Sequence, residues 1–112
     1  MIKPKDPRDL AIALMSRSIA SVQVAAVLAD RWGIHSWGWN SAGPTGLGIH
    51  AEHHCLIRAN RSRLAGSTLY VAAQRKRNGK PITAKPCEKC QLLIGGIGKI
   101  MWRENDSFWY RL

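Results

Sequence analysis

The sequence predicts an α/β protein, a three-layer α/β/α sandwich built around a mixed five-stranded sheet. Helical and strand-like segments follow one another in the order α-β-β-α-β-α-β-β over 112 residues. Only Glu104–Ser107 separate the last two strand-like segments. A parallel crossover needs about a dozen residues, so these two strands should be antiparallel neighbours. The length suits one compact domain, residues 1–112, and excludes a barrel of about 250 residues.

The first helix should begin at Asp6 and Pro7, because aspartate favours the N-cap and proline the first helical position. The valine-rich segment Ser21–Ala29 should be a buried strand. A second strand should cover Ile34–Asn40, and its end is marked by the glycine-rich loop over residues 41–48.

The middle of the chain should fold as a helix over His50–Leu64, on which Cys55, Leu56 and Ala59 share one face. A third strand should follow at Ser67–Ala73, because that segment is short, apolar and rich in strand-forming residues.

The last third should begin with a basic loop over Arg75–Lys85, in which Asn78-Gly79 signals a turn. A further helix should cover residues 86–96. The strands Lys99–Arg103 and Phe108–Leu112 then complete the sheet.

Charge is the unusual part of the composition. Lys and Arg total 17 against 7 Asp and Glu, which gives a net charge of +10. Between Arg58 and Lys89 lie nine Lys or Arg and one acid, so +8 of that charge falls in one segment. Such a balance points to anionic partners such as nucleic acid or nucleotides. The alternative is a solvated face that keeps a small protein soluble.

A membrane partner is not expected. The longest weakly polar run, Ile19–Ala29, is about half of the ~20 apolar residues that a spanning helix needs. The charged residues Asp6, Arg8 and Asp9 stand where a signal peptide would have its apolar region. We therefore expect a cytoplasmic protein.

Four residues carry the expected chemistry. Cys87 and Cys90 are three apart at a helix start, where their sulfurs converge and the helix dipole favours thiolates. With His50 they provide three ligands, the number typical of a catalytic zinc that also holds a water. Zinc lowers the pKa of such a water to about 7. Glu52 can then carry its proton to a leaving group.

The pattern His-x-Glu followed by Pro-Cys-x-x-Cys is typical of zinc nucleobase deaminases. On His50-Ala51-Glu52 and Pro86–Cys90 the chain resembles the cytidine deaminase superfamily. Thr68–Val71 matches the strand that usually precedes the second motif, and Gly38-Trp39-Asn40 matches the end of the second strand. The resemblance covers nearly the whole chain and implies a cytidine deaminase-like fold with one Zn²⁺ per chain.

The features of different branches are mixed. His-Ala-Glu at residues 50–52 is similar to the deoxycytidylate, tRNA and APOBEC-like branches. The antiparallel last two strands resemble the free-nucleoside branch instead, and no segment matches the C-terminal helices of the tRNA and APOBEC-like enzymes. The segment between Val71 and Pro86 is longer and more basic than in many members. Relatives are often oligomeric, so a homo-oligomer is also expected.

Substrate contacts follow from the resemblance and from charge. By resemblance, Asn40 contacts the sugar and the Ala51 amide contacts the base, although Asn40 could instead cap the following loop. Trp102 is a candidate for base stacking, whereas Trp37 and Trp39 should share a strand face and pack under a helix. The expected phosphate contacts are Arg75, Lys76, Arg77, Lys80 and Lys85.

A purely structural zinc is the alternative to a catalytic one. It would need a fourth protein ligand, for which Cys55, His53 and His54 are the candidates. Cys55 lies five residues after His50 and suits the core better. A structural site would also not require the carboxylate of Glu52.

The sequence therefore predicts hydrolytic deamination of cytosine to uracil, with attack at C4 and loss of ammonia, in single-stranded DNA or RNA. A free deoxycytidine nucleotide, as used by dCMP deaminases, is the alternative substrate. Further alternatives are adenine in tRNA or DNA, and a non-catalytic, zinc-stabilised module that binds nucleic acid.

Overall fold

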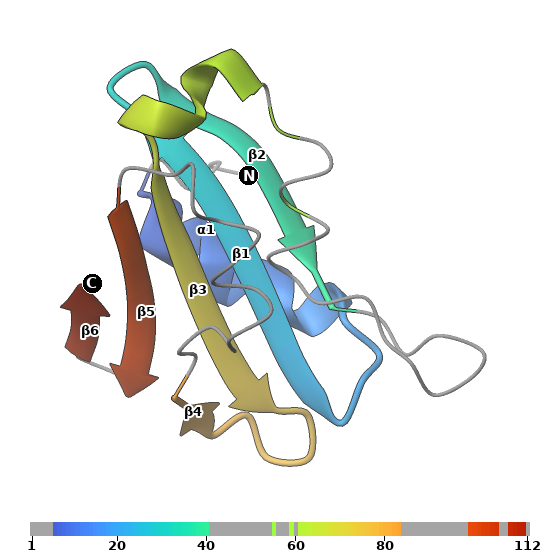
Figure 1. The fold of residues 1–112 in the computed structure, drawn as a ribbon. Coiled ribbons are helices and arrows are strands. Elements are labelled where there is room, and N and C mark those ends of the chain that lie inside the picture. The colour runs from blue at the N-terminus through green and yellow to red at the C-terminus, as the bar shows by residue number, and fades with distance from the viewer. Residues whose placement is uncertain are drawn as a thin grey trace.

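The computed structural model describes residues 6–40, 55, 59, 61–83, 99–105 and 108–111. The helical segments are α1 (Pro7–Leu14) and the 3₁₀ turns η1 (Met15–Arg17) and η2 (Arg61–Gly66). The strands are β1 (Val22–Asp30), β2 (Gly33–Trp39), β3 (Thr68–Arg75), β4 (Pro81–Ile82), β5 (Lys99–Asn105) and β6 (Phe108–Arg111). Figure 1 shows α1 crossing one face of the sheet.

Five strands lie side by side in the order β2-β1-β3-β5-β6, and the short β4 pairs with β3. β3 and β5 are parallel, whereas all other pairs are antiparallel. The predicted α/β class, the mixed sheet and the antiparallel pairing of the last two strands are confirmed.

The strand β4 is missing from the sequence prediction. The predicted loop over Arg75–Lys85 is wrong in part, because Arg75 ends β3 and the chain pairs again with β3 after the turn. The Arg75 N–H donates to the Lys80 carbonyl at 3.0 Å, and Gly79 closes the turn with a φ of +70°. A strand of two residues has no alternation that a sequence pattern could reveal.

The first helix begins as the sequence predicts. Asp6 caps α1 by accepting a hydrogen bond from the Arg8 N–H at 2.8 Å, and Pro7 opens the helix. The helix covers an apolar cluster on one face of the sheet, which we call the α1 face: Ala11, Leu14, Met15, Ala25, Val27 and Ala72. None of the helices within the described residues is long and apolar enough to cross a membrane.

The opposite face of the sheet carries a second core cluster, Ala26, Leu28, Cys55, Leu69, Val71 and Ala73. We call it the Cys55 face. Ala59 packs against the same cluster, which confirms that Cys55 and Ala59 share a face, whereas Leu56 lies outside the described residues. α1 and Cys55 lie on opposite faces of the sheet, which agrees with the predicted three-layer arrangement.

Trp37 and Trp39 both lie on the α1 face, where they pair with Val27 and Ala25. Trp39 packs against the core there, with the Arg17 guanidinium 5.6 Å from its ring centre. Trp37 is 41% exposed, so the prediction that both pack under a helix is wrong for this residue. The reason is geometric, since α1 lies mainly over β1 and β3 and covers little of the edge strand β2.

Candidate functional site

The structure describes part of the predicted site. Outside the described residues lie His50, Ala51, Glu52, Lys85, Cys87 and Cys90, together with His53 and His54. Within them lie Asn40, Arg75, Lys76, Arg77, Lys80 and Trp102. No three His, Cys, Asp or Glu side chains of the described residues gather as a possible metal site. Cys55 is fully buried in the core, as the sequence predicts.

The C-terminal ends of β2, β3 and β5 meet at one edge of the sheet, which we call the carboxyl edge. β1 is antiparallel to both β2 and β3, and β3 is parallel to β5, so these three strands run in the same direction. Their arrowheads in Figure 1 point the same way. Asn40 follows β2 at this edge, and Arg75 ends β3 there. Open α/β sheets bind ligands beyond the carboxyl ends of their strands.

Asn40 closes the carboxyl end of the β1–β2 pair with its side chain. Its backbone N–H donates to the Val24 carbonyl at 3.0 Å, and its Oδ1 accepts the Val24 N–H at 2.8 Å. Nδ2 donates to the Val22 carbonyl at 2.8 Å, and Ser18 Oγ donates to Oδ1 at 2.7 Å. Asn40 therefore has a structural role. The second N–H of Nδ2 has no partner among the described residues.

Two glutamines extend this network across three strands. Gln23 Nε2 donates to the Ser18 carbonyl at 2.7 Å, and Gln74 Nε2 donates to Gln23 Oε1 at 2.8 Å. The sequence analysis gave Ser18, Gln23 and Gln74 no role. The signal that could have found Gln23 is its polar side chain inside a valine-rich strand, because a buried amide needs a hydrogen-bond partner.

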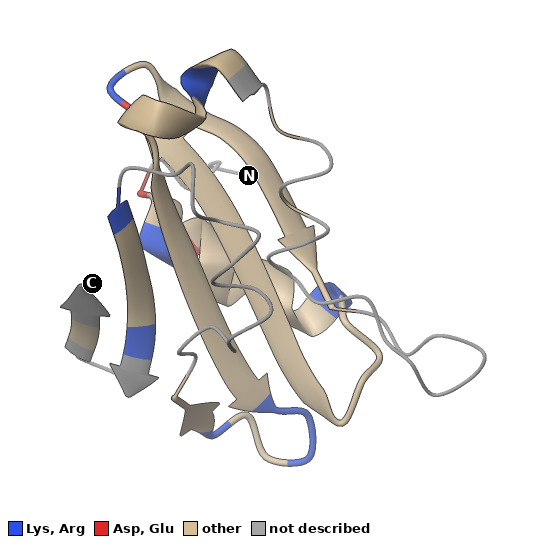
Figure 2. Ribbon diagram, viewed as in Figure 1, with Lys and Arg blue, Asp and Glu red and all other residues tan. Residues whose placement is uncertain are grey.

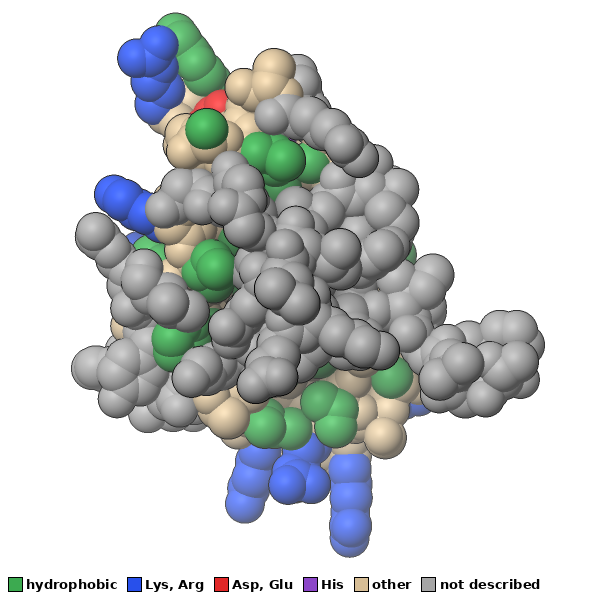
Figure 3. All heavy atoms as spheres, in the orientation of Figure 1, with side chains coloured by type: hydrophobic (Ala, Val, Ile, Leu, Met, Phe, Trp, Pro, Cys, Tyr) green, Lys and Arg blue, Asp and Glu red, His purple; other side chains and the backbone are tan. Residues whose placement is uncertain are grey.

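Four exposed cations, Arg75, Lys76, Arg77 and Lys80, occupy the turn between β3 and β4, which we call the basic turn. Figure 2 shows them gathered below the sheet, and Figure 3 shows basic side chains projecting from that end of the molecule. The Lys76 N–H donates to the Ser21 carbonyl at 3.0 Å, which ties the turn to the start of β1. None of the four forms an ion pair with another described residue.

Trp102 lies on the Cys55 face. It is half-buried, pairs with Val71 of β3 and packs against the core cluster. Arg75 belongs to the same face, because it stands two residues beyond Ala73 on β3 and strand side chains alternate. The register thus brings Trp102 and Arg75 to the face that also holds Cys55.

One hydrogen bond links β2 to the segment that carries the first motif. Ser36 Oγ donates to the Cys55 carbonyl oxygen at 2.7 Å. Ser36 is 2% exposed and Cys55 is fully buried. The sequence pattern did not single out Ser36, since nothing local to β2 indicates a partner 19 residues away.

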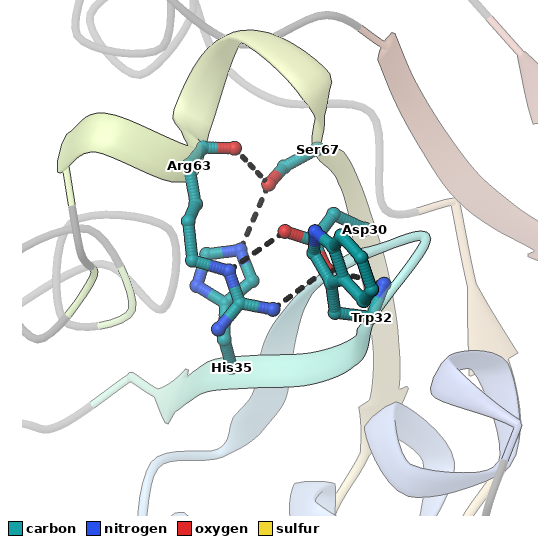
Figure 4. Close-up of polar contacts among 5 residues, drawn as sticks. All are labelled: Asp30, Trp32, His35, Arg63 and Ser67. Carbon is teal, nitrogen blue, oxygen red and sulfur yellow. Dashed lines mark hydrogen bonds and ion pairs between the residues drawn. The ribbon is translucent and has the colours of Figure 1, made fainter.

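The opposite edge of the sheet holds a second polar cluster, shown in Figure 4 and called here the Arg63 edge: Asp30, Trp32, His35, Arg63 and Ser67. Arg63 donates twice to the Asp30 carboxylate, from Nε at 2.7 Å and from Nη2 at 2.6 Å. The Trp32 N–H also donates to this carboxylate, at 2.9 Å. These bonds hold the pKa of Asp30 well below its usual value.

The protonation of His35 follows from its neighbours. Ser67 Oγ donates its one proton to the Arg63 carbonyl at 2.6 Å, so it accepts from His35 Nε2 at 2.8 Å. His35 Nδ1 is then unprotonated, buried and without a hydrogen-bond partner among the described residues. Burial and, second, the positive charge of Arg63 lower the pKa of His35. His35 is therefore a neutral imidazole at neutral pH.

A family profile described as the cytidine and deoxycytidylate deaminase zinc-binding region matches residues 4–102. That range includes both sequence motifs and all the described strands except part of β5 and β6. No curated protein sequence matches the chain significantly.

Three solved structures show the same fold. A cytidine deaminase from Burkholderia pseudomallei superposes with a TM-score of 0.71 at 19% identity, over 95% of this chain and 88% of the other. A cytidine deaminase from Mycobacterium leprae gives 0.61 at 22% identity, over 93% and 88%. A dCMP deaminase from the cyanophage S-TIM5 gives 0.56 at 20% identity, over 95% and 88%.

Proposed function

This chain belongs to the cytidine and deoxycytidylate deaminase zinc-binding family, and we propose that it converts cytosine to uracil in single-stranded nucleic acid. As a member of this family it is a zinc-dependent hydrolase that deaminates a cytosine base. The observation that carries the choice of substrate is the basic turn, four exposed cations at the carboxyl edge. This edge also holds Asn40, the proposed sugar contact.

His50, Cys87 and Cys90 hold the zinc in this proposal. An imidazole and two thiolates are a donor set that zinc prefers, and three protein ligands leave a position for water. When bound, the zinc supplies hydroxide at neutral pH by lowering the pKa of that water to about 7. Two findings support the set: the family match spans all three residues, and the remaining cysteine, Cys55, is committed to the core.

Glu52 moves the proton in this mechanism. Its carboxylate takes a proton from the water and returns it to the amino group at C4, which leaves as ammonia. The Ala51 amide contacts the base, and the second N–H of Asn40 Nδ2 contacts the sugar. Trp102, half-buried on the Cys55 face, stacks on a base.

The few residues between each motif and the described part of the chain limit how far apart the two motifs can lie. His50 is five residues before Cys55, so it lies within roughly 18 Å of it. Cys87 is four residues after Thr83, so it lies within roughly 14 Å of that residue. Ile82, next to Thr83, packs against the same core cluster as Cys55. Both motifs are thus tethered to the Cys55 face.

The basic turn is suited to a polymer. Val22 pairs with Arg75, and Asn40 Nδ2 donates to the Val22 carbonyl. Strands lie about 4.8 Å apart, so the backbones of Asn40 and Arg75 are roughly 10 Å apart across the edge. A sugar at Asn40 therefore has its phosphates within reach of Arg75, whose side chain can extend toward it. One phosphate needs one or two cations, whereas four cations serve a phosphate backbone.

A free deoxycytidine nucleotide is the second candidate substrate. The antiparallel β5–β6 pair, which resembles the free-nucleoside branch, is present. The similar solved structures are also named as cytidine and dCMP deaminases. Under this candidate Arg75 alone would meet the phosphate.

The test is a parallel assay of the purified protein on single-stranded DNA, single-stranded RNA, dCMP and cytidine, scored for uracil. We expect the polymers to react with the highest kcat/KM. A preference for dCMP would favour the second candidate. A zinc-loaded protein that forms no uracil from any of the four would contradict the assignment of a cytosine deaminase.

A pair of charge variants tests the role of the basic turn. Lys76→Gln/Arg77→Gln removes two phosphate contacts. Between about 50 and 200 mM salt, the loss of affinity for a single strand should therefore be roughly sevenfold smaller in this variant than in the wild type. The matched control is Arg31→Gln/Lys99→Gln, which removes two cations at the opposite edge of the sheet. An equal salt dependence in both variants would assign the basic turn to solubility.

A further inference from the structure

We propose that Ser36 is a positioning residue for the zinc ligand His50 and the proton carrier Glu52. The inference rests on the proposed roles of those two residues. It assigns to a buried hydroxyl of β2 the task of fixing the main chain just beyond the first motif.

Cys55 is held at two points. Its side chain is fully buried among Ala26, Leu28 and the β3 residues of the Cys55 face. Its carbonyl oxygen accepts the Ser36 hydroxyl proton at 2.7 Å. Cys55 is helical, and the carbonyl bond joins this stretch of main chain to β2 in addition to the contact made by the side chain.

The fixed residue stands close to the motif along the chain. Glu52 is three residues before Cys55 and His50 is five residues before it. Three residues span at most about 11 Å, so a shift of the Cys55 main chain acts close to Glu52. A 1 Å displacement of a reacting group can cost a large part of a rate.

Packing alone does not account for a serine at position 36. It pairs with Leu28 and faces the apolar Cys55 core, so alternation would favour an apolar side chain. A buried hydroxyl costs free energy unless it is hydrogen-bonded. Among the described residues, the bond that satisfies this hydroxyl is the one to the Cys55 carbonyl.

The first variant is Ser36→Ala. We expect zinc affinity, measured by competition with a chelator, to fall about tenfold, in the range found when a metal ligand loses its outer support. We also expect kcat to fall about tenfold and KM to change less than kcat, because the substrate contacts at Asn40 and the basic turn are unaffected and only the Ala51 amide moves with the motif. In Ser36→Thr the hydroxyl is kept, and zinc affinity should return.

Ser67→Ala is the matched control. Ser67 is 1% exposed, and its Oγ likewise donates to a main-chain carbonyl, that of Arg63 at 2.6 Å. It lies at the opposite edge, and the hydrogen-bond partners of its Oγ among the described residues are the Arg63 carbonyl and His35. We expect a loss of melting temperature in the zinc-free protein similar to that of Ser36→Ala, with zinc affinity and kcat as in the wild type.

The outcomes separate the two proposals. Equal zinc affinity and equal kcat in Ser36→Ala and Ser67→Ala would overturn the positioning role, whether both are unchanged or both reduced. A wild-type protein that binds no zinc, or binds it without forming uracil, would instead contradict the proposed function. If Ser36→Ala does not fold, the test rests on Ser36→Thr. A Ser36→Thr protein with wild-type stability but tenfold weaker zinc binding would also overturn the positioning role, because it keeps the hydroxyl.

Discussion

Positive charge has different surroundings at the two edges of the sheet. At the Arg63 edge the Asp30 carboxylate, whose side chain is 7% exposed, binds the Arg63 guanidinium through two hydrogen bonds. At the carboxyl edge the four cations of the basic turn form no ion pair with any described residue. Charge is used to join elements of the fold at one edge and is left exposed at the other.

The contrast separates the charges that stabilise the fold from those that do not. A bidentate pair between Arg63 and Asp30 ties η2 to the end of β1, so its loss should affect stability. Clustered like charges repel one another and add nothing to folding. The basic turn is therefore the region whose charge requires an explanation from outside the chain, and an anionic substrate provides one.

The largest effect is expected from Glu52→Ala, which tests the proposed proton carrier. We expect kcat to fall about 10²- to 10⁴-fold, since proton transfer by a placed carboxylate contributes that much. Zinc content by metal analysis and affinity for a single strand should not change. Glu88→Ala, a neighbouring acid in the second motif, is the control and should keep its turnover. Loss of zinc in Glu52→Ala would mean that the carboxylate supports the metal instead.

A second test asks whether the side-chain hydrogen bonds of Asn40 stabilise the carboxyl edge. Asn40→Ala removes three side-chain hydrogen bonds. At about 1 kcal/mol each, the free energy of unfolding should fall by about 3 kcal/mol. Asn40→Asp keeps the two hydrogen bonds that Oδ1 accepts, so its free energy of unfolding should fall by less. Asn78→Ala, which removes one exposed bond at 2.9 Å, is the control.

Denaturation in urea measures these differences, and KM of the folded variants reports the sugar contact. If Asn40→Ala raises KM without changing the unfolding free energy, the asparagine serves the ligand and not the edge.

The smallest effect is expected from pH at the Arg63 edge. Because the pKa of His35 is lowered in the folded protein, the unfolded state binds more protons as pH falls below its pKa of about 6.5. The stability from neutral His35 is therefore present above that pH and is lost as pH falls toward the folded pKa. Between about pH 7 and 5 the melting temperature should drop a few degrees more in the wild type than in His35→Gln.

Glutamine can keep the donor to Ser67 Oγ and does not titrate, which makes it the suitable variant. Equal melting curves at both pH values would show that His35 is not linked to folding. Deamination should be unaffected by this variant, because His35 lies away from the carboxyl edge.

Much of the fold was open to prediction from local signals. Asp6 and Pro7 define the helix start, and the valine pattern of β1 alternates between the two core clusters. Because the link after β5 is short, β6 had to be the antiparallel neighbour of β5. Each of these signals acts within a few residues, where propensity and patterning are informative.

The contacts that sequence reasoning missed join distant residues. Ser36 meets Cys55, Ser18 meets Asn40, and Asp30 meets Arg63, across 19, 22 and 33 residues. No local pattern specifies such a pair, because the partner is set by register and packing. The proposed zinc ligands are the opposite case: His50, Cys87 and Cys90 are predicted from spacing and chemistry, without knowledge of their surroundings.

The two-residue strand β4 has a consequence for how the carboxyl edge can be approached. β5 pairs with β3 only along Thr68–Val71, and β4 pairs with Ala73 and Gln74 further along. The last stretch of β3 is thus covered and is not an open strand edge to which another extended chain could add. An extended ligand cannot add to β3 here, so the cations of the basic turn would meet it through their side chains. Exchanging those cations would change recognition without disturbing the pairing of β3 with its neighbours.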